Sequence, residues 1–254
     1  MNLSLPKIIT TLLITLFVFN NSWGQPANSF NVNFNKLNNR VWIGQDFWAV
    51  PMEDWRVENG RVECIADRGN SLVNILTQVL SGKGELKVSA KVGKLQNNNE
   101  LGTVGFTLGL QDETDNDVRS LCYFGKGIKV GIDVGGELYI GDETAKIPDG
   151  FSYDEVLLSV HANRTESDNW LKLTATDKNG LVIELESKKK FPLKGICTLA
   201  NNHPGKAKGK KTTNFWFDDL SISGSMVEKK PENSFGPLFW SMYSLSKKEM
   251  KLSV

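Results

Sequence analysis

The sequence predicts an all-β protein, built as an antiparallel sandwich or barrel, and three observations lead to this fold class. Short strand patterns fill residues 40–226 and are separated by Gly, Asn and Asp residues. Asn-Gly and Gly-Gly pairs join several of these patterns, and such pairs favour tight hairpins. No amphipathic stretch longer than about two helical turns precedes residue 240, and no repeat of roughly 20–50 residues indicates a propeller or solenoid.

The first residues of the chain have the parts of an export signal. Lys7 precedes an apolar stretch at residues 8–19, and Ser22-Trp23-Gly24 supplies small residues for cleavage. The apolar stretch is shorter than the roughly 20 residues that span a bilayer. We therefore expect a signal peptide over residues 1–24, a mature chain without a membrane span, and a secreted or periplasmic protein.

A polar, Asn-rich leader is expected at residues 25–39, followed by one sandwich domain at residues 40–226. Residues 85–92 and 103–110 alternate apolar with polar side chains, so every second residue faces a core. The Asn59-Gly60 pair predicts a hairpin between its flanking strands. Further strands are expected at residues 61–66, 71–80, 120–124, 127–134, 137–140, 154–161, 170–176, 181–186, 195–200 and 213–223.

Charge and cysteine content exclude several classes of protein. Lys plus Arg (30) nearly balance Asp plus Glu (29), so no strong field points to nucleic acid. The three cysteines, Cys64, Cys122 and Cys197, all lie in apolar stretches. Their odd number argues against a disulfide scaffold and favours buried thiols, while one disulfide plus one free thiol stays open as the alternative.

The end of the chain changes in composition. Residues 227–234 are polar and contain Pro, which is typical of a linker. They are followed by FGPLFWSMYSLSKKEMKLSV, which is rich in aromatic and apolar residues. We expect residues 227–254 to be a linker and a truncated domain junction, whose aromatic side chains either fold back onto the sandwich or stay exposed.

Three stretches carry a resemblance to a known family. FWAVPMEDWRVENGRVEC at residues 47–64 resembles the first strands of the sandwich domain at the N-terminus of secreted bacterial alkaline phosphatase D (PhoD-like) proteins. FGPLFWSMYSL at residues 235–245 resembles the segment that follows that domain. TNFWFDDLSISG at residues 213–224 resembles the last strand of concanavalin-like and laminin-G-like sandwiches. The resemblance implies an antiparallel jelly-roll β-sandwich of the concanavalin A-like lectin/glucanase type.

In that family the chemistry belongs to a downstream metallophosphatase domain, and this chain offers no match for its ligands. His161 and His203, the only histidines, are too few for a centre with two metal ions. We therefore expect an accessory or binding module without a catalytic residue. The alternative is a hydrolase, either a divergent glycoside hydrolase or an interrupted alkaline phosphatase D. A retaining glycosidase needs two carboxyl groups about 5 Å apart. The nearest candidates are Glu184 and Glu186, which have the pattern of a solvent-facing side, and the acidic residues within 113–117.

Two kinds of binding site are candidates. Trp48, Tyr123 and Trp216 could present flat rings to a sugar, with Arg119 beside them, although core packing explains most aromatic residues. Structural calcium could bind the acidic loop with Asp112, Asp115 and Asp117, or Asp219 in the last strand. The competing interpretations are a solvated loop and an Asp that caps a bulge. The expected partner is a glycan or a separately encoded phosphatase domain.

Overall fold

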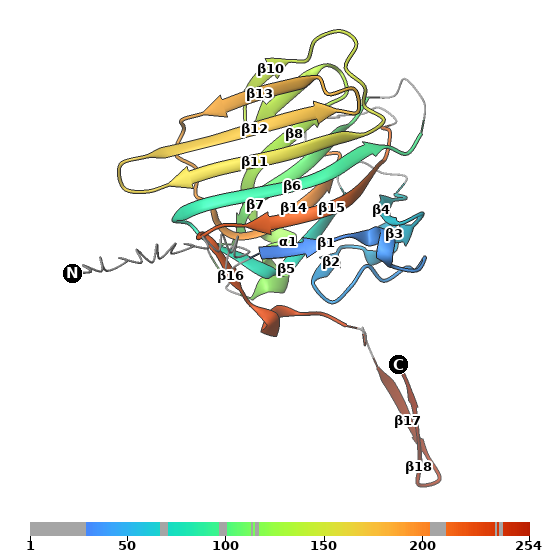
Figure 1. The fold of residues 1–254 in the computed structure, drawn as a ribbon. Coiled ribbons are helices and arrows are strands. Elements are labelled where there is room, and N and C mark those ends of the chain that lie inside the picture. Colours follow the sequence, from blue (N-terminus) through green and yellow to red (C-terminus); the bar gives the residue numbers. More distant parts are fainter. Residues whose placement is uncertain are drawn as a thin grey trace, which may run out of the picture.

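The computed structural model describes residues 29–66, 71–96, 101–112, 114, 117–203, 212–236, 238 and 241–254. Their strands form two large antiparallel sheets of eight strands each and one separate two-stranded hairpin (Figure 1). The predicted all-β jelly-roll sandwich is confirmed. Within these ranges no helix is both long and apolar enough to cross a membrane. The expected signal peptide lies outside the described residues.

The first sheet has the strand order β13-β12-β11-β6-β15-β4-β3, and β1 also pairs with β15. β15 binds β6 along one edge, while β4 and β1 pair with successive parts of β15, at residues 216–217 and 220–223. The strands of this sheet are β1 (Ser29–Val32), β3 (Trp55–Glu58), β4 (Arg61–Cys64), β6 (Gly84–Lys94), β11 (Val156–Arg164), β12 (Asn169–Asp177), β13 (Val182–Ser187) and β15 (Phe215–Ser223).

The second sheet has the order β10-β9-β8-β7-β14-β5-β16, and β2 also pairs with β5. From β7 to β10 each strand pairs antiparallel with the next one along the chain, with α1 (Val118–Phe124) inserted between β7 and β8. The strands of this sheet are β2 (Phe47–Ala49), β5 (Ser71–Ser81), β7 (Thr103–Gln111), β8 (Lys126–Asp133), β9 (Glu137–Ile140), β10 (Glu143–Lys146), β14 (Lys194–Asn201) and β16 (Val227–Lys229). Three short 3₁₀ turns, η1 (Phe34–Lys36), η2 (Met52–Asp54) and η3 (Pro231–Asn233), lie between strands.

The apolar core lies between the two sheets, as the alternating patterns predict. Leu86, Val88, Ala90 and Val92 of β6 are all buried and belong to the core cluster. They are joined from the second sheet by side chains such as Phe106 of β7. Burial of this apolar area supplies most of the drive to fold.

The β3–β4 hairpin confirms the turn chemistry read from Asn59-Gly60. Both residues have positive φ (53° and 72°), and Glu58 pairs directly with Arg61. Two positive φ angles are the requirement of the tight hairpin turn that Asn-Gly favours. A side chain at position 60 would lie 2.3 Å from Asn35 Oδ1, so glycine is needed here for space as well.

Two sequence-based expectations are corrected by the strand pairing. Residues 120–124 form part of the helix α1 (Val118–Phe124), not a strand. β7 and β8 pair directly with each other up to Gln111 and Lys126. The segment that connects them, which includes residues 120–124, therefore does not lie between them as a strand. The sandwich also begins by Ser29, inside the expected leader, because β1 pairs with β15; it extends past residue 226 because β16 pairs with β5.

The C-terminal segment divides into two parts. Phe235 folds back onto the sandwich, where its ring lies 5.5 Å from that of Trp48. β17 (Met242–Ser246) and β18 (Glu249–Ser253) form a hairpin that stands away from the two sheets (Figure 1). Its large apolar side chains, including Tyr243 and Leu252, are exposed. Both expected fates of the tail, folding back and exposure, therefore occur in different parts of it.

Candidate functional site

The helix α1 lies between β7 and β8 and is fastened at its first turn. The backbone oxygen of Asp117 accepts the N–H groups of Ser120 and Leu121. The Ser120 hydroxyl donates to Asp112 Oδ2 (2.8 Å), and Thr114 donates its N–H and hydroxyl to Asp112 Oδ1. These bonds hold the pKa of Asp112 below its ordinary value of 3.8, and the bond from the Thr114 backbone N–H contributes most. Asp112 thus stays ionised at neutral pH and ties the loop to the helix.

Aromatic rings from three separate segments meet beside α1. Trp48 of β2 lies edge-on to Tyr123 of α1, with ring centroids 6.3 Å apart, and its ring also contacts Phe235. Tyr123 and Phe124 are 61% and 72% exposed, so this cluster is open to solvent. Aromatic rings left exposed in this way offer flat apolar surface together with a polar hydroxyl, the combination found where proteins bind ligands.

The position of Trp48 is set by backbone pairing and by a side-chain hydrogen bond. β2 pairs with β5 so that Trp48 is opposite Asn74, and Asn74 Nδ2 donates to the Trp48 oxygen at 3.0 Å. On the other side, the Phe235 N–H donates to the Gln45 oxygen at 2.7 Å. The ring cluster therefore rests on ordered strands rather than on a loose loop.

Two adjoining cavities open beside the aromatic cluster. One, of about 420 Å³, is lined by Trp48, Phe235, Asp117, Glu232, Asn233 and Ser234 among others. The other, of about 460 Å³, shares Val118, Glu232 and Asn233 with it. η3 forms their shared wall and is held to β5, because Asn233 Nδ2 donates to the Leu76 oxygen at 3.1 Å. Together they form a groove with aromatic, carboxylate, amide and hydroxyl groups, which can both stack on a ring and bond hydroxyl groups.

The structure brings two of the expected ligand-binding rings together and separates the third. Trp48 lines the groove, and Tyr123 contacts its ring from α1. Trp216 is on β15 in the first sheet and is only 7% exposed, because Arg61 lies over its ring. The expectation that Trp216 is exposed was wrong. Its neighbours Phe215 and Phe217 point into the core as expected, so it does face outward, but Arg61 covers it there. Arg119 belongs to α1, and its side chain lies outside the described set.

The expected calcium ligands do not gather into one site in the described part of the chain. Asp219 lies in the first sheet. It accepts a hydrogen bond from Asn33 Nδ2 at 2.6 Å and forms an ion pair with Lys91 at 3.0 Å. It has a positive φ of 48° at a break in the β15 register, as expected for an Asp at a bulge. Asp112 is bonded to Thr114 and Ser120, and Asp115 lies outside the described residues. No group of three or more His, Cys, Asp or Glu among the residues described is arranged to hold a metal ion.

The two histidines occupy different parts of the sandwich. His161 of β11 is 2.8 Å from Glu85 Oε1 and lies edge-on to Trp170. His203 is buried against the second sheet, with Nδ1 2.5 Å from the Tyr139 hydroxyl. Burial raises the pKa of the Tyr139 phenol, which therefore stays protonated. This buried pair fastens the chain after β14 to the sheet.

The sequence patterns indicate buried cysteine thiols and solvent-facing carboxylates at Glu184 and Glu186. None of Cys64, Cys122 and Cys197 forms a disulfide. Burial raises the pKa of the Cys122 and Cys197 thiols to about 12, with the charge of Asp117 adding to the effect at Cys122. Glu184 and Glu186 are both exposed on β13, and Glu184 pairs with Lys172 of the neighbouring strand.

Several groove residues were not foreseen as ligand-binding residues. Phe235, Glu232 and Asn233 line the cavity beside Trp48, and Phe124 contacts the Tyr123 ring. A sequence signal existed for Phe235, because it begins an aromatic-rich segment directly after a polar stretch. No sequence signal existed for Glu232 and Asn233, because only the pairing of β16 with β5 places η3 beside α1.

Comparison with known proteins identifies the fold. No protein-family model and no curated protein match the sequence. Solved structures do match. The Lotus tetragonolobus seed lectin aligns with 80% of this chain and 100% of its own length, at a TM-score of 0.51 and 12% identity. The chain has a legume-lectin-like jelly-roll fold.

Two further lectins support the same conclusion. The Bauhinia forficata lectin, solved in complex with GalNAc, covers 78% of this chain and 99% of its own, at a TM-score of 0.51 and 10% identity. The winged bean acidic lectin, solved with methyl-α-D-galactose, covers 80% of this chain and 100% of its own, at a TM-score of 0.52 and 8% identity. Likeness at such low identity shows the fold and leaves ligand and ancestry open.

Proposed function

We propose that the chain is a non-catalytic, lectin-like module that binds an uncharged glycan in the groove beside α1. The observation that carries this proposal is that Trp48 lines a cavity and contacts the exposed ring of Tyr123. Sugars have apolar ring faces that pack on aromatic side chains, and hydroxyl groups that bond to carboxylates and amides. Asp117, Glu232 and Asn233 place such groups next to the rings.

An uncharged ligand is favoured by the balance of charge at the groove. Asp112, Asp117, Glu228 and Glu232 line the two cavities together with Lys194 and Lys230. Lys230 Nζ lies 3.7 Å from Glu228, so part of the basic charge is already compensated. The remaining carboxylates accept hydroxyl hydrogens, and they disfavour an anionic ligand through like-charge repulsion.

Isothermal titration calorimetry against a panel of neutral oligosaccharides tests the proposal. We expect a saturable heat with at least one of them. The absence of heat across the panel, with circular dichroism showing a folded protein, contradicts the proposal. Assays with p-nitrophenyl phosphate and aryl glycosides test the non-catalytic part, since turnover by the purified chain would make it a hydrolase.

We further propose that the sandwich is related to the N-terminal domain of alkaline phosphatase D proteins. Its support is that the two Trp- and Phe-rich stretches at residues 47–64 and 235–245 meet in space, through Trp48 and Phe235. We infer that a separately encoded phosphatase domain is the protein partner. Co-purification with such a domain, encoded next to this chain, tests the inference, and an elution profile identical to that of the separate proteins contradicts it.

Export is likewise proposed, from the signal-peptide pattern of residues 1–24. We expect the mature protein in the medium or the periplasm, shortened by about this segment. Cell fractionation followed by intact-mass measurement checks both points. A full-length mass in the cytoplasmic fraction contradicts export.

A further inference from the structure

A third cavity, of about 660 Å³, lies on the outer face of the first sheet, away from the groove beside α1. Trp216 of β15 and Arg61 of β4 line it, together with Lys94, Tyr153, Asp154 and Lys178. Phe215 and Phe217, the neighbours of Trp216 in the strand, point into the core, so the Trp216 ring faces outward into this cavity. Nothing in the proposed glycan groove uses these residues.

The Trp216 ring is held flat against the sheet. It lies over Gly93 of β6, where an added Cβ would be 2.6 Å from the indole and 2.0 Å from the Asp154 oxygen. The Arg61 guanidinium lies above the ring, with its carbon 5.0 Å from the ring centroid. Stacking on an aromatic face restrains a guanidinium and leaves its edge available for hydrogen bonds.

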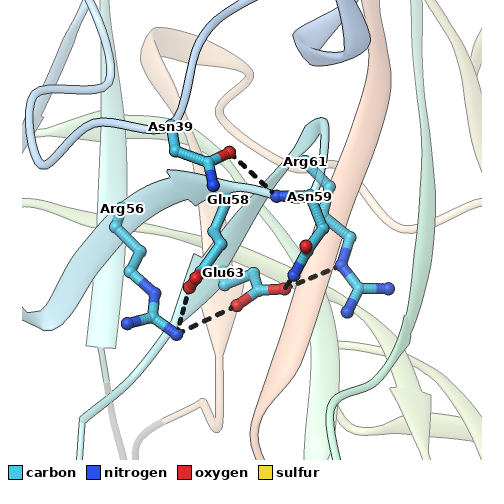
Figure 2. A network of polar contacts seen from close by, with 6 residues as sticks. All are labelled: Asn39, Arg56, Glu58, Asn59, Arg61 and Glu63. Atoms are coloured by element: carbon cyan, nitrogen blue, oxygen red, sulfur yellow. Dashed lines mark hydrogen bonds and ion pairs between the residues drawn. The ribbon is translucent and has the colours of Figure 1, made fainter.

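A buried carboxylate orients Arg61 from one side. Glu63 is 4% exposed and accepts the Arg61 Nε–H at 2.9 Å. Arg56 and Asn59 bind the same carboxylate from its other sides (Figure 2). In Figure 2 the two terminal nitrogens of Arg61 turn away from Glu63, and they have no hydrogen-bond partner in the part of the chain that the structure describes. Arg61 is thus fixed by its Nε and its stacking contact, with its terminal donors unused.

Charged and polar side chains surround this pair of donors. Lys178 is paired with Asp154 at 2.6 Å, and this bond lowers the pKa of Asp154 and raises that of Lys178, so both are charged. Lys94 adds a third cation and Glu155 a second carboxylate to the lining. Counting Glu63, which Arg61 binds, three carboxylates balance the three cations, and Ser152 and Gln96 supply polar groups that suit ring hydroxyls.

We propose that this cavity binds the carboxylate or sulfate group of an acidic sugar. The terminal nitrogens of Arg61 donate to two oxygens of that group, in the parallel arrangement that guanidinium and carboxylate prefer. Trp216 and Glu63 keep the guanidinium in place before the ligand arrives, which lowers the entropy cost of binding. The protein would then hold an acidic sugar on one sheet and an uncharged glycan on the other.

The test compares two arginine variants in calorimetric titrations with trigalacturonic acid, its methyl ester and a sulfated trisaccharide. Arg61→Gln should weaken binding of an acidic trisaccharide by roughly ten- to a hundredfold, the effect of losing a charge-assisted pair. Arg56→Gln is the matched control, because Arg56 also binds Glu63 but does not line the cavity; it should bind as the wild type does. The two acidic ligands distinguish carboxylate from sulfate, and the methyl ester should bind at least tenfold more weakly than the free acid.

Lys178→Gln provides a second variant on the far side of the cavity, for use if Arg61→Gln fails to fold. It should also weaken binding and reduce its dependence on salt. Equal affinity for the acid and its ester overturns the proposal, as does the absence of heat with both acidic ligands. Equal losses in the Arg56 and Arg61 variants also overturn it, since they would reflect the hairpin as a whole.

Discussion

The Trp48 indole meets the Tyr123 ring edge-on, with ring planes at 80° and centroids 6.3 Å apart. The contact joins β2 of the second sheet to the helix α1, two segments that are distant in the sequence. The sandwich does not need the Tyr123 ring to close its core, because that ring is 61% exposed. This exposed contact is the basis of the proposed glycan groove.

Replacing Tyr123 should separate folding from binding. Tyr123→Ala should lower the free energy of unfolding by about 1 kcal/mol or less, since the variant loses one edge-to-face contact. Trp55→Ala, at a core residue that packs on Phe217, should cost about 3–5 kcal/mol. Urea unfolding of both variants measures the difference. A Tyr123 variant as unstable as the Trp55 variant would assign the ring to the core.

Glu63 should be the side chain on which the polar network of the β3–β4 hairpin depends. Its carboxylate binds Arg56, Asn59 and Arg61 (Figure 2). Glu63→Ala leaves these donors without their shared acceptor and should lower stability by about 2 kcal/mol or more. Glu186→Ala, at an exposed position, should change it by less than about 0.5 kcal/mol. Chemical denaturation compares the two, and similar values would argue against the network.

Asp177 should make stability depend on pH below the ordinary range of a carboxyl group. Burial raises its pKa, but hydrogen bonds from Ser152, Leu181 and Asn179 outweigh it, so the pKa lies below 3.8. A lowered pKa in the folded state stabilises the fold above pH 3.8, and this contribution disappears as pH falls through the folded value. Asp177→Asn should therefore be less stable than wild type at pH 7, and the gap should narrow below pH 3.8. Thermal unfolding across pH measures the gap, and a constant gap would contradict this.

The cysteine thiols should be unreactive while the protein is folded. The pKa of about 12 for Cys122 and Cys197 leaves almost no thiolate at pH 8, and Cys64 is buried. We expect slow labelling of all three by a disulfide reagent at pH 8, and rapid labelling in denaturant. Fast labelling of one thiol in the native protein would show that its pKa is much lower than its burial implies.

The sequence predicts the sandwich well because alternation and turn chemistry are local signals. Leu86 and Val88 show the expected alternation, and Asn59-Gly60 forms the expected turn. Residues 120–124 were predicted as a strand, and their sequence, SLCYF, is a short run with three large apolar or aromatic side chains. A short segment with such a pattern suits either structure, and the direct pairing of β7 with β8 decides for a helix.

The site is harder to predict because tertiary pairing assembles it. Trp48 and Tyr123 could be named as candidate rings, but their contact depends on α1 lying beside β2. Trp216 has the same strand alternation as an exposed ring, yet Arg61 from a neighbouring strand covers it. Which side chain lies above another across a sheet follows from register, and register is not visible in one sequence.

The most direct test of the groove is a titration of three proteins with the neutral oligosaccharide that binds best in the panel. Trp48→Ala should weaken binding by about tenfold or more, since it removes the stacking surface. Trp170→Ala, at a ring on the first sheet beside His161, should leave the affinity unchanged. Equal affinity of the Trp48 variant and wild type, in a folded protein, would contradict the assignment of glycan binding to this groove.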